Sequence, residues 1–179
     1  MCKPDLDGLY GPNKIAERVS DAEKLLRPES LTKLTDETAP LLKALMEAAA
    51  NGLPLARGLF AHTPMLWVLD GSGEIFIALE EVVTNDTYRF LRPRSRRDNM
   101  HDERETRLGH PSLVGGDCMA RLGGELSYDP GWGSQLEGWF ISNASGRYGM
   151  QKGHADRHLR NVCDLFSTFG ITVRPIFYS

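Results

Sequence analysis

The segment from Gly109 to Tyr148 constrains the fold more than any other part of this chain. It holds nine of the eighteen glycines, yet it also carries large apolar residues such as Leu122, Trp139 and Ile141. Glycine between apolar strand residues marks a turn, a bulge or a close approach of backbone. The segment therefore predicts short strands joined by tight turns around a pocket. A glycine-rich hairpin that only supports the core is the alternative.

Several polar residues of this segment are candidates for the walls of such a pocket, because they lie between or beside the glycines. These candidates are His110, Ser112, Glu125, Ser145, Arg147 and Tyr148.

Length and composition fit one domain over residues 1–179, with a helical part at 1–52 and a sheet-rich part at 53–179. The net charge of −3 gives no reason to expect a nucleic acid or a membrane as partner. No apolar run reaches the roughly 20 residues of a membrane span. Three scattered cysteines, Cys2, Cys118 and Cys163, suit free thiols in a reducing compartment.

Apolar spacing predicts helices in the first part of the chain. Lys14–Leu26 has apolar residues at helical spacing and is stopped by Pro28. Residues 30–50 form a second helical stretch that Pro40 divides, with Thr38 as a candidate cap and Asn51-Gly52 as a stop.

Strand patterns begin at Leu53. The runs LPLARGLF (53–60) and MLWVLD (65–70) predict strands, and residues 70–73 predict a hairpin turn into a strand at 74–78. Residues 155–169 predict an amphipathic helix, followed by a terminal strand at 171–178. This order predicts an α+β fold, with N-terminal helices packed on a mainly antiparallel sheet.

Residues 84–107 form a polar run in which arginines such as Arg94, Arg96 and Arg97 alternate with acids. Such a run is typical of a solvated excursion. The alternative is a mobile basic loop that clamps a phosphate-bearing ligand.

Four motifs in order resemble a known domain: WVLDGSGEIFIA, GHPSLVGG, ARLGGEL and ISNASGRYG, within residues 64–173. They are similar to the VLD-x-x-G-x-x-Y, HSSFLAGG, AAGEL and SGHY motifs of a domain found at the C-terminal end of plant IQ-motif calmodulin-binding proteins. The same domain occurs in bacterial proteins that look like effectors or polymorphic toxins. This chain departs from the motifs at Pro111 and Arg147 and has no IQ pattern, so calmodulin binding is not carried over.

The resemblance implies an effector made in the bacterial cytoplasm and delivered into the cytosol of a target cell. It also implies a target protein and a cognate immunity protein as partners.

Two catalytic arrangements are open. Ser112, His110 and Glu125 are the residue types of a serine-hydrolase nucleophile, base and orienting acid. Arg57, Ser112 and Glu125 resemble in order the Arg–Ser–Glu ADP-ribosyltransferases, in which arginine holds the NAD phosphates and glutamate stabilises the ribosyl cation. The second arrangement leads us to expect NAD as substrate, with ADP-ribose transfer or NAD cleavage as the reaction.

Two further possibilities remain. His154 and His158, with Asp156 or Asp164, have the spacing of a helical zinc site, although we expect no metal because the metalloprotease pattern is incomplete. A non-enzymatic module that binds a partner through the glycine-rich pocket and the basic loop, with Trp132 and Trp139 as anchors, is the alternative to an enzyme.

Overall fold

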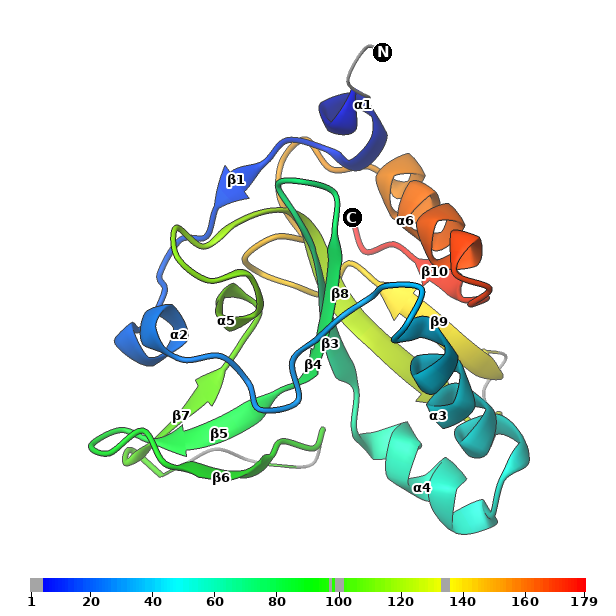
Figure 1. Ribbon diagram of the computed structural model, residues 1–179, viewed down its shortest axis with the longest axis horizontal. Helices are drawn as coiled ribbons and strands as arrows, with labels where there is room; N and C mark the ends of the chain where they lie inside the picture. The colour runs from blue at the N-terminus through cyan, green and yellow to red at the C-terminus, as the bar shows by residue number, and fades with distance from the viewer. Residues whose placement is uncertain (1–4, 97, 99–101, 133–135) are drawn as a thin grey trace.

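The computed structural model describes residues 5–96, 98, 102–132 and 136–179 (Figure 1). Cys2 and Arg97, both named above, lie outside the described residues. The helices are α1 (Leu6–Tyr10), α2 (Asp21–Leu25), α3 (Ala39–Asn51), α4 (Pro54–His62), α5 (Pro111–Val114) and α6 (Asp156–Thr168). The strands are β1 (Lys14–Ile15), β2 (Thr32–Lys33), β3 (Met65–Asp70), β4 (Ile75–Leu79), β5 (Glu81–Thr84), β6 (Phe90–Pro93), β7 (Glu105–Leu108), β8 (Met119–Asp129), β9 (Gly138–Ser142) and β10 (Arg174–Ile176).

The strands form two sheets. The central sheet has the order β10-β9-β8-β3-β4-β2, with β1 paired to β8, and the smaller sheet has the order β6-β5-β7. Every pairing is antiparallel except the one between β9 and β10. The predicted α+β fold with a mainly antiparallel sheet is confirmed.

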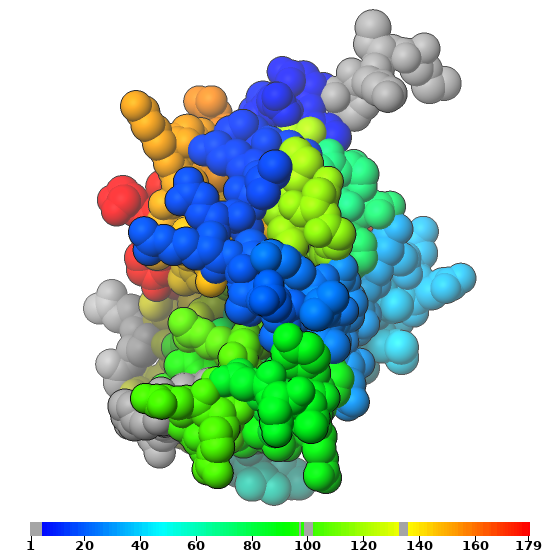
Figure 2. Space-filling view, turned by 90° about the vertical axis from the view of Figure 1, so that its left-hand side faces the viewer, coloured from blue at the N-terminus to red at the C-terminus, as the bar shows by residue number. Residues whose placement is uncertain are grey.

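The central sheet separates two layers (Figure 1). Helices α3, α4 and α6 cover one face, where Trp67 of β3, Leu126 of β8 and Phe166 of α6 belong to the same buried cluster. The other face carries α2, α5 and the smaller sheet, and there Leu66 and Val68 pack with Leu113 and Tyr148. In Figure 2, the N-terminal segment in blue lies above the smaller sheet in green on this second side. Alternation along a strand therefore sends successive β3 side chains into different layers.

The β3–β4 hairpin was predicted correctly. The amide of Gly73 donates to the carbonyl of Asp70, and Gly73 has a positive φ of 89°. The Asp70 carboxylate accepts from the amides of Ser72 and Glu74, at 2.9 and 2.8 Å. The turn is thus stabilised by its own aspartate. Helix α6 also lies where the amphipathic pattern predicted it.

The first predicted helix, Lys14–Leu26, is wrong. Lys14 and Ile15 pair with β8, and only Asp21–Leu25 is helical. Ser20 starts this helix with a capping box, in which its hydroxyl accepts from the amide of Glu23 and the Glu23 carboxylate accepts from the amide of Ser20. The capping box at Ser20 therefore starts the helix inside the apolar repeat instead of at Lys14.

The prediction over residues 30–50 was half right. Its second part is α3, which begins at Ala39 with Pro40 in the first turn, where proline costs no hydrogen bond. Gly52 ends it as expected. The first part is not helical, because Thr32 and Lys33 pair with β4 as an edge strand.

The predicted strand LPLARGLF is a helix, α4. Pro54 occupies its first turn, and the segment has no β-branched residue but three leucines and an alanine, which favour a helix. The polar run at 84–107 also differs from the expected excursion, since it contributes strands β6 and β7 to the smaller sheet.

Candidate functional site

A polar cleft of about 270 Å³ lies between the central sheet, the smaller sheet and the segment that contains α2 and α5. Four of the candidate residues line it, namely His110, Glu125, Ser145 and Arg147. The other residues that line it are Glu23, Leu66, Glu80, Arg94, Arg107, Gly109, Pro111, Ala144 and Gly146. The motif segment therefore does build a pocket, although three of its charged residues come from the smaller sheet or lie directly beside its strands, namely Glu80, Arg94 and Arg107.

Glu125 projects into the cleft from the middle of β8. Its neighbours Leu122 and Leu126 face the helices, so alternation turns the Glu125 side chain to the other face. Its Oε2 accepts a hydrogen bond from Arg96 Nη2 at 3.1 Å. Burial raises the pKa of Glu125, while Arg96 opposes that rise and Glu80 adds to it. The cleft thus holds a carboxylate that burial disfavours in its charged form.

Glu80 and Arg94 form a second charged pair at the cleft, with 2.6 Å between Arg94 Nη1 and Glu80 Oε2. Arg107 approaches the other oxygen of Glu80 at 4.0 Å. Arg147 lies 3.6 Å from Glu23. Arg94 Nε and Arg147 Nη1 are buried without a hydrogen-bond partner in the described structure. Guanidinium groups beside a cleft whose hydrogen-bond donors are not all used suit an anionic ligand.

His110 stands at the start of α5 and lines the cleft. Its Nε2 lies 2.9 Å from the carbonyl oxygen of Gly124. Burial lowers the pKa of His110, so the neutral ring donates Nε2–H to this carbonyl and keeps a lone pair on Nδ1. A Cβ atom on Gly123 would lie 3.4 Å from the His110 ring and 3.1 Å from the Trp67 carbonyl oxygen. The glycine lets the ring approach β8 closely.

Ser112 does not face the cleft. The residue is fully buried, and its hydroxyl donates to the carbonyl oxygen of Gly109 at 2.7 Å. The predicted strand at this position is the short helix α5, and residues two apart on a helix do not share a face. Among the described contacts, no hydrogen bond joins Ser112 to His110 or His110 to Glu125. The structure does not assemble the Ser–His–Glu arrangement.

Ser145 and Tyr148 shape the turn beyond β9. The Ser145 hydroxyl accepts from the amide of Tyr148 at 3.2 Å. The Tyr148 ring is buried, and its hydroxyl donates to the carbonyl oxygen of Cys118 at 2.6 Å. Burial also raises the pKa of Tyr148, so it stays protonated. Tyr148 supports the cleft from behind.

Arg57 lies far from the other candidates in the fold. It belongs to α4, and its Nη2 donates to the carbonyl oxygen of Ala50 in α3 at 2.7 Å. Helices α3 and α4 cover the face of the central sheet opposite Glu125 (Figure 1). The expected approach of Arg57 to Ser112 and Glu125 is therefore wrong, because Arg57 lies in a helix instead of the first strand of the sheet.

The histidine pair is also arranged differently from a helical zinc site. His154 precedes α6 and only His158 lies in it, with the two rings 6.2 Å apart. The described residues contain no cluster of three or more His, Cys, Asp or Glu side chains suited to a metal ion. None of the described helices is long and apolar enough to span a bilayer.

Sequence reasoning missed Glu80, whereas the two arginines that reach it, Arg94 and Arg107, belong to the basic run at 84–107 considered above as a phosphate clamp. Glu80 and Glu81 interrupt the apolar run IFIALEEVV, at the point where the chain passes from β4 to β5. Paired acids inside an apolar run are the signal that was available. Glu81 is structural, because its carboxylate accepts from the amides of Glu29 and Ser30.

Comparisons with protein-family models, curated proteins and solved structures return no match for this chain.

Proposed function

We propose that the cleft around Glu125 cleaves the glycosidic bond of NAD and passes ADP-ribose to a target protein or to water. The observation that carries this proposal is the juxtaposition of a half-buried carboxylate with arginines whose hydrogen-bond donors are not all used. Glu125, Arg94 and Arg147 all line the cleft. Arg94 Nε has no hydrogen-bond partner among the described residues, and Arg147 Nη1 has only the Glu23 carboxylate, at 3.6 Å.

The chemistry needs both kinds of group. The bond from the ribose C1′ to the nicotinamide nitrogen breaks, and its electron pair leaves with nicotinamide. The cation that develops at C1′ is stabilised by a nearby carboxylate. An oxygen or nitrogen of the acceptor then bonds to C1′ and releases its proton to water. Planar, permanently charged guanidinium groups hold the phosphates.

The roles differ from those expected from sequence. Arg94 and Arg147 take the phosphate-binding role that the sequence pattern suggested for Arg57. Ser112 has no role in the reaction, because its hydroxyl stabilises the turn at Gly109. At about 270 Å³, the cleft is small for a whole dinucleotide. We expect it to hold nicotinamide, its ribose and one phosphate, with the adenosine outside.

Incubation with NAD and measurement of released nicotinamide tests the proposal. Wild type should release nicotinamide, and Glu125→Gln should lower the rate by about a hundredfold, the scale of losing one such stabilising group. Circular dichroism should show both proteins folded. Equal rates in the two proteins would exclude a catalytic role for Glu125.

The resemblance in motif order supports the wider setting of this proposal. In that setting the protein is an effector or toxin made in a bacterium, delivered into the cytosol of a target cell and neutralised by an immunity protein. Co-expression tests it, since growth arrest by wild type should be absent with Glu125→Gln.

A partner-binding module is the second candidate function. Trp132 is 66% exposed, and exposed tryptophan is a common centre of binding energy, whereas Trp139 is buried and donates from Nε1 to the carbonyl of Met46. If growth arrest survives Glu125→Gln and is lost with Trp132→Ala, binding through Trp132 is the better account.

A further inference from the structure

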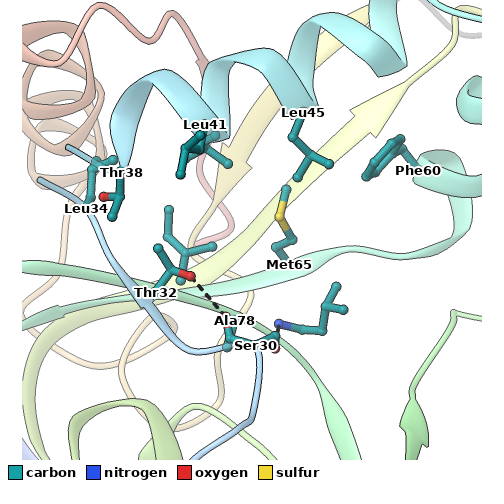
Figure 3. Close-up of a pocket in the computed structure, with 12 residues that line it drawn as sticks. Ser30, Thr32, Leu34, Thr38, Leu41, Leu45, Phe60, Met65 and Ala78 are labelled. Carbon is teal, nitrogen blue, oxygen red and sulfur yellow. Dashed lines mark hydrogen bonds between the residues drawn. The ribbon is translucent and has the colours of Figure 1, made fainter. Parts of the chain in front are cut away.

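A second hollow lies on the opposite side of the central sheet from the polar cleft. It has a volume of about 520 Å³ and is bounded by α3, the end of α4 and strand β4 (Figure 3). Leu45, Phe60 and Met65 gather at one end of it (Figure 3). This volume is in the range of small-molecule sites.

Three hydroxyl groups mark the other part of the hollow, those of Ser30, Thr32 and Thr38 (Figure 3). Each of these hydroxyl groups donates its hydrogen to another group of the protein. Ser30 donates to Glu81 Oε1 at 2.6 Å, Thr32 to the Ser30 carbonyl at 3.1 Å, and Thr38 to the Lys33 carbonyl at 2.6 Å. A hydroxyl that donates elsewhere offers a ligand only oxygen lone pairs. The Ser30 oxygen already accepts from the amide of Leu79 and the Thr38 oxygen from the amide of Thr35, each at 2.9 Å. Of the three hydroxyl groups, that of Thr32 is therefore the acceptor left for a ligand.

None of the twelve described residues that line the hollow is charged. A carboxylate or phosphate placed there would lose its hydration with no cation to pair with, and it would face oxygen lone pairs. The lining therefore disfavours anionic amphiphiles. The polar cleft, in contrast, is expected to favour an anionic ligand.

We propose that this hollow binds an uncharged amphiphile, a medium-length alkyl chain that ends in a hydroxyl group. The chain lies against Leu45, Phe60 and Met65, and the ligand hydroxyl donates to the oxygen of Thr32. Burial of each methylene contributes about 0.8 kcal/mol, so a chain of about eight carbons is enough for measurable binding after the cost of association. This site is independent of the reaction proposed for the Glu125 cleft.

Titration with 1-octanol tests the site, with the methyl resonance of Met65 as the readout in protein labelled at methionine methyl groups. Met65→Leu identifies that resonance. We expect a saturable shift with 1-octanol. Its isomer 1-methoxyheptane, which accepts but cannot donate, should bind several-fold more weakly, the scale of one neutral hydrogen bond. Sodium octanoate should give no saturable shift.

Leu45→Glu should abolish the shift, because it places a carboxylate beside the alkyl chain. Leu45 is 40% exposed, so the fold should tolerate this change, and Leu45→Trp fills the hollow without charge if it does not. Leu55→Glu is the matched control, since Leu55 is 80% exposed on α4 and does not line the hollow. Equal binding of the three compounds, or no saturable shift with octanol, would overturn the proposal. A concentration-dependent dimer that Leu45→Glu dissociates would overturn it too, because a second copy would then be the occupant.

Discussion

Arg96 forms an ion pair with Glu125, a residue that lines the polar cleft, with 3.1 Å between Nη2 and Oε2. The same Nη2 donates to the Ser127 hydroxyl at 2.8 Å. Arg96 follows β6 of the smaller sheet and Glu125 lies in β8 of the central sheet, so this pair ties the two sheets together. Arg96 also favours the ionised form of the Glu125 carboxylate, on which the proposed reaction depends.

Arg96→Gln should move the acidic limb of the rate–pH profile to higher pH. Arg96 opposes the rise that burial gives the pKa of Glu125, so its removal raises that pKa further. Because the proposed reaction needs ionised Glu125, activity should then be lost at a higher pH. The profile of kcat/KM for nicotinamide release measures the shift. Arg92→Gln is the control, since Arg92 pairs with Asp98 and Glu105. If both variants keep the wild-type limb, Arg96 does not tune Glu125.

Ser112→Ala should leave nicotinamide release within about twofold of wild type and lower the free energy of unfolding by about 1 kcal/mol, the worth of one hydrogen bond. The reason is that the Ser112 hydroxyl donates to the Gly109 carbonyl and does not reach the cleft. Urea unfolding and the nicotinamide assay separate the two effects. A loss of activity with unchanged stability would restore Ser112 as a nucleophile.

Gly124→Ala should prevent folding or destabilise the protein by more than about 3 kcal/mol, as overpacking against backbone is costly. A Cβ atom on Gly124 would lie 1.7 Å from the Ser142 carbonyl oxygen, at the contact between β8 and β9. Gly58→Ala in α4 is the matched control, because its Cβ would meet nothing within 4 Å. That change should stabilise the protein by up to about 1 kcal/mol. Thermal unfolding of both variants gives the comparison.

His110→Gln should make the protein less sensitive to acid. Burial lowers the pKa of His110 in the folded state, so the unfolded chain binds the proton more readily. The free energy of unfolding is therefore highest above the ordinary histidine pKa and falls as the pH drops through it. Glutamine can still donate to the Gly124 carbonyl but does not titrate. The slope of stability against pH between about 7 and 5 should be lower by up to about 1.4 kcal/mol per pH unit. An unchanged slope would assign the acid sensitivity to His154 and His158, whose pKa values burial also lowers.

The elements that were predicted from sequence are those in which local chemistry and packing agree. The β3–β4 hairpin carries its turn residues between two apolar runs, and α6 has an amphipathic repeat with Gly170 just beyond its end. The glycines of the central segment also behave as expected, since Gly123 and Gly124 admit the His110 ring and the β9 backbone.

The errors arose where contacts distant in sequence decide the structure. Lys14 and Ile15 have a helical apolar pattern, but pairing with β8 makes them a strand. The run at Leu53 has apolar content that suits a strand or a helix, and Pro54 together with packing of Phe60 against Trp139 makes it a helix. Because this segment is a helix, Arg57 lies outside the site predicted for it. Of the two arginines that replace it, Arg147 follows β9 within the glycine-rich segment at 109–148, whereas Arg94 follows β6, and no local pattern relates Arg94 to Glu125.

Arg147→Gln should raise the KM for NAD by about tenfold or more and leave kcat within a few-fold, whereas Arg57→Gln should change neither. The two residues separate the sequence-based site from the observed one. Arg147 lines the cleft, where its Nη1 has no hydrogen-bond partner among the described residues and lies 3.6 Å from Glu23 Oε2, so a phosphate would compete with Glu23 for this guanidinium. A charged hydrogen bond of this kind contributes about 1.5–3 kcal/mol to binding, which corresponds to the expected change in KM. Arg57 donates to Ala50 on the other side of the sheet, and its loss should cost only stability. Steady-state kinetics of nicotinamide release measures both variants, with urea unfolding as the check on folding. The opposite result, a raised KM in Arg57→Gln with Arg147→Gln like wild type, would place the phosphate site on the helical face and remove the Glu125 cleft from the proposed reaction.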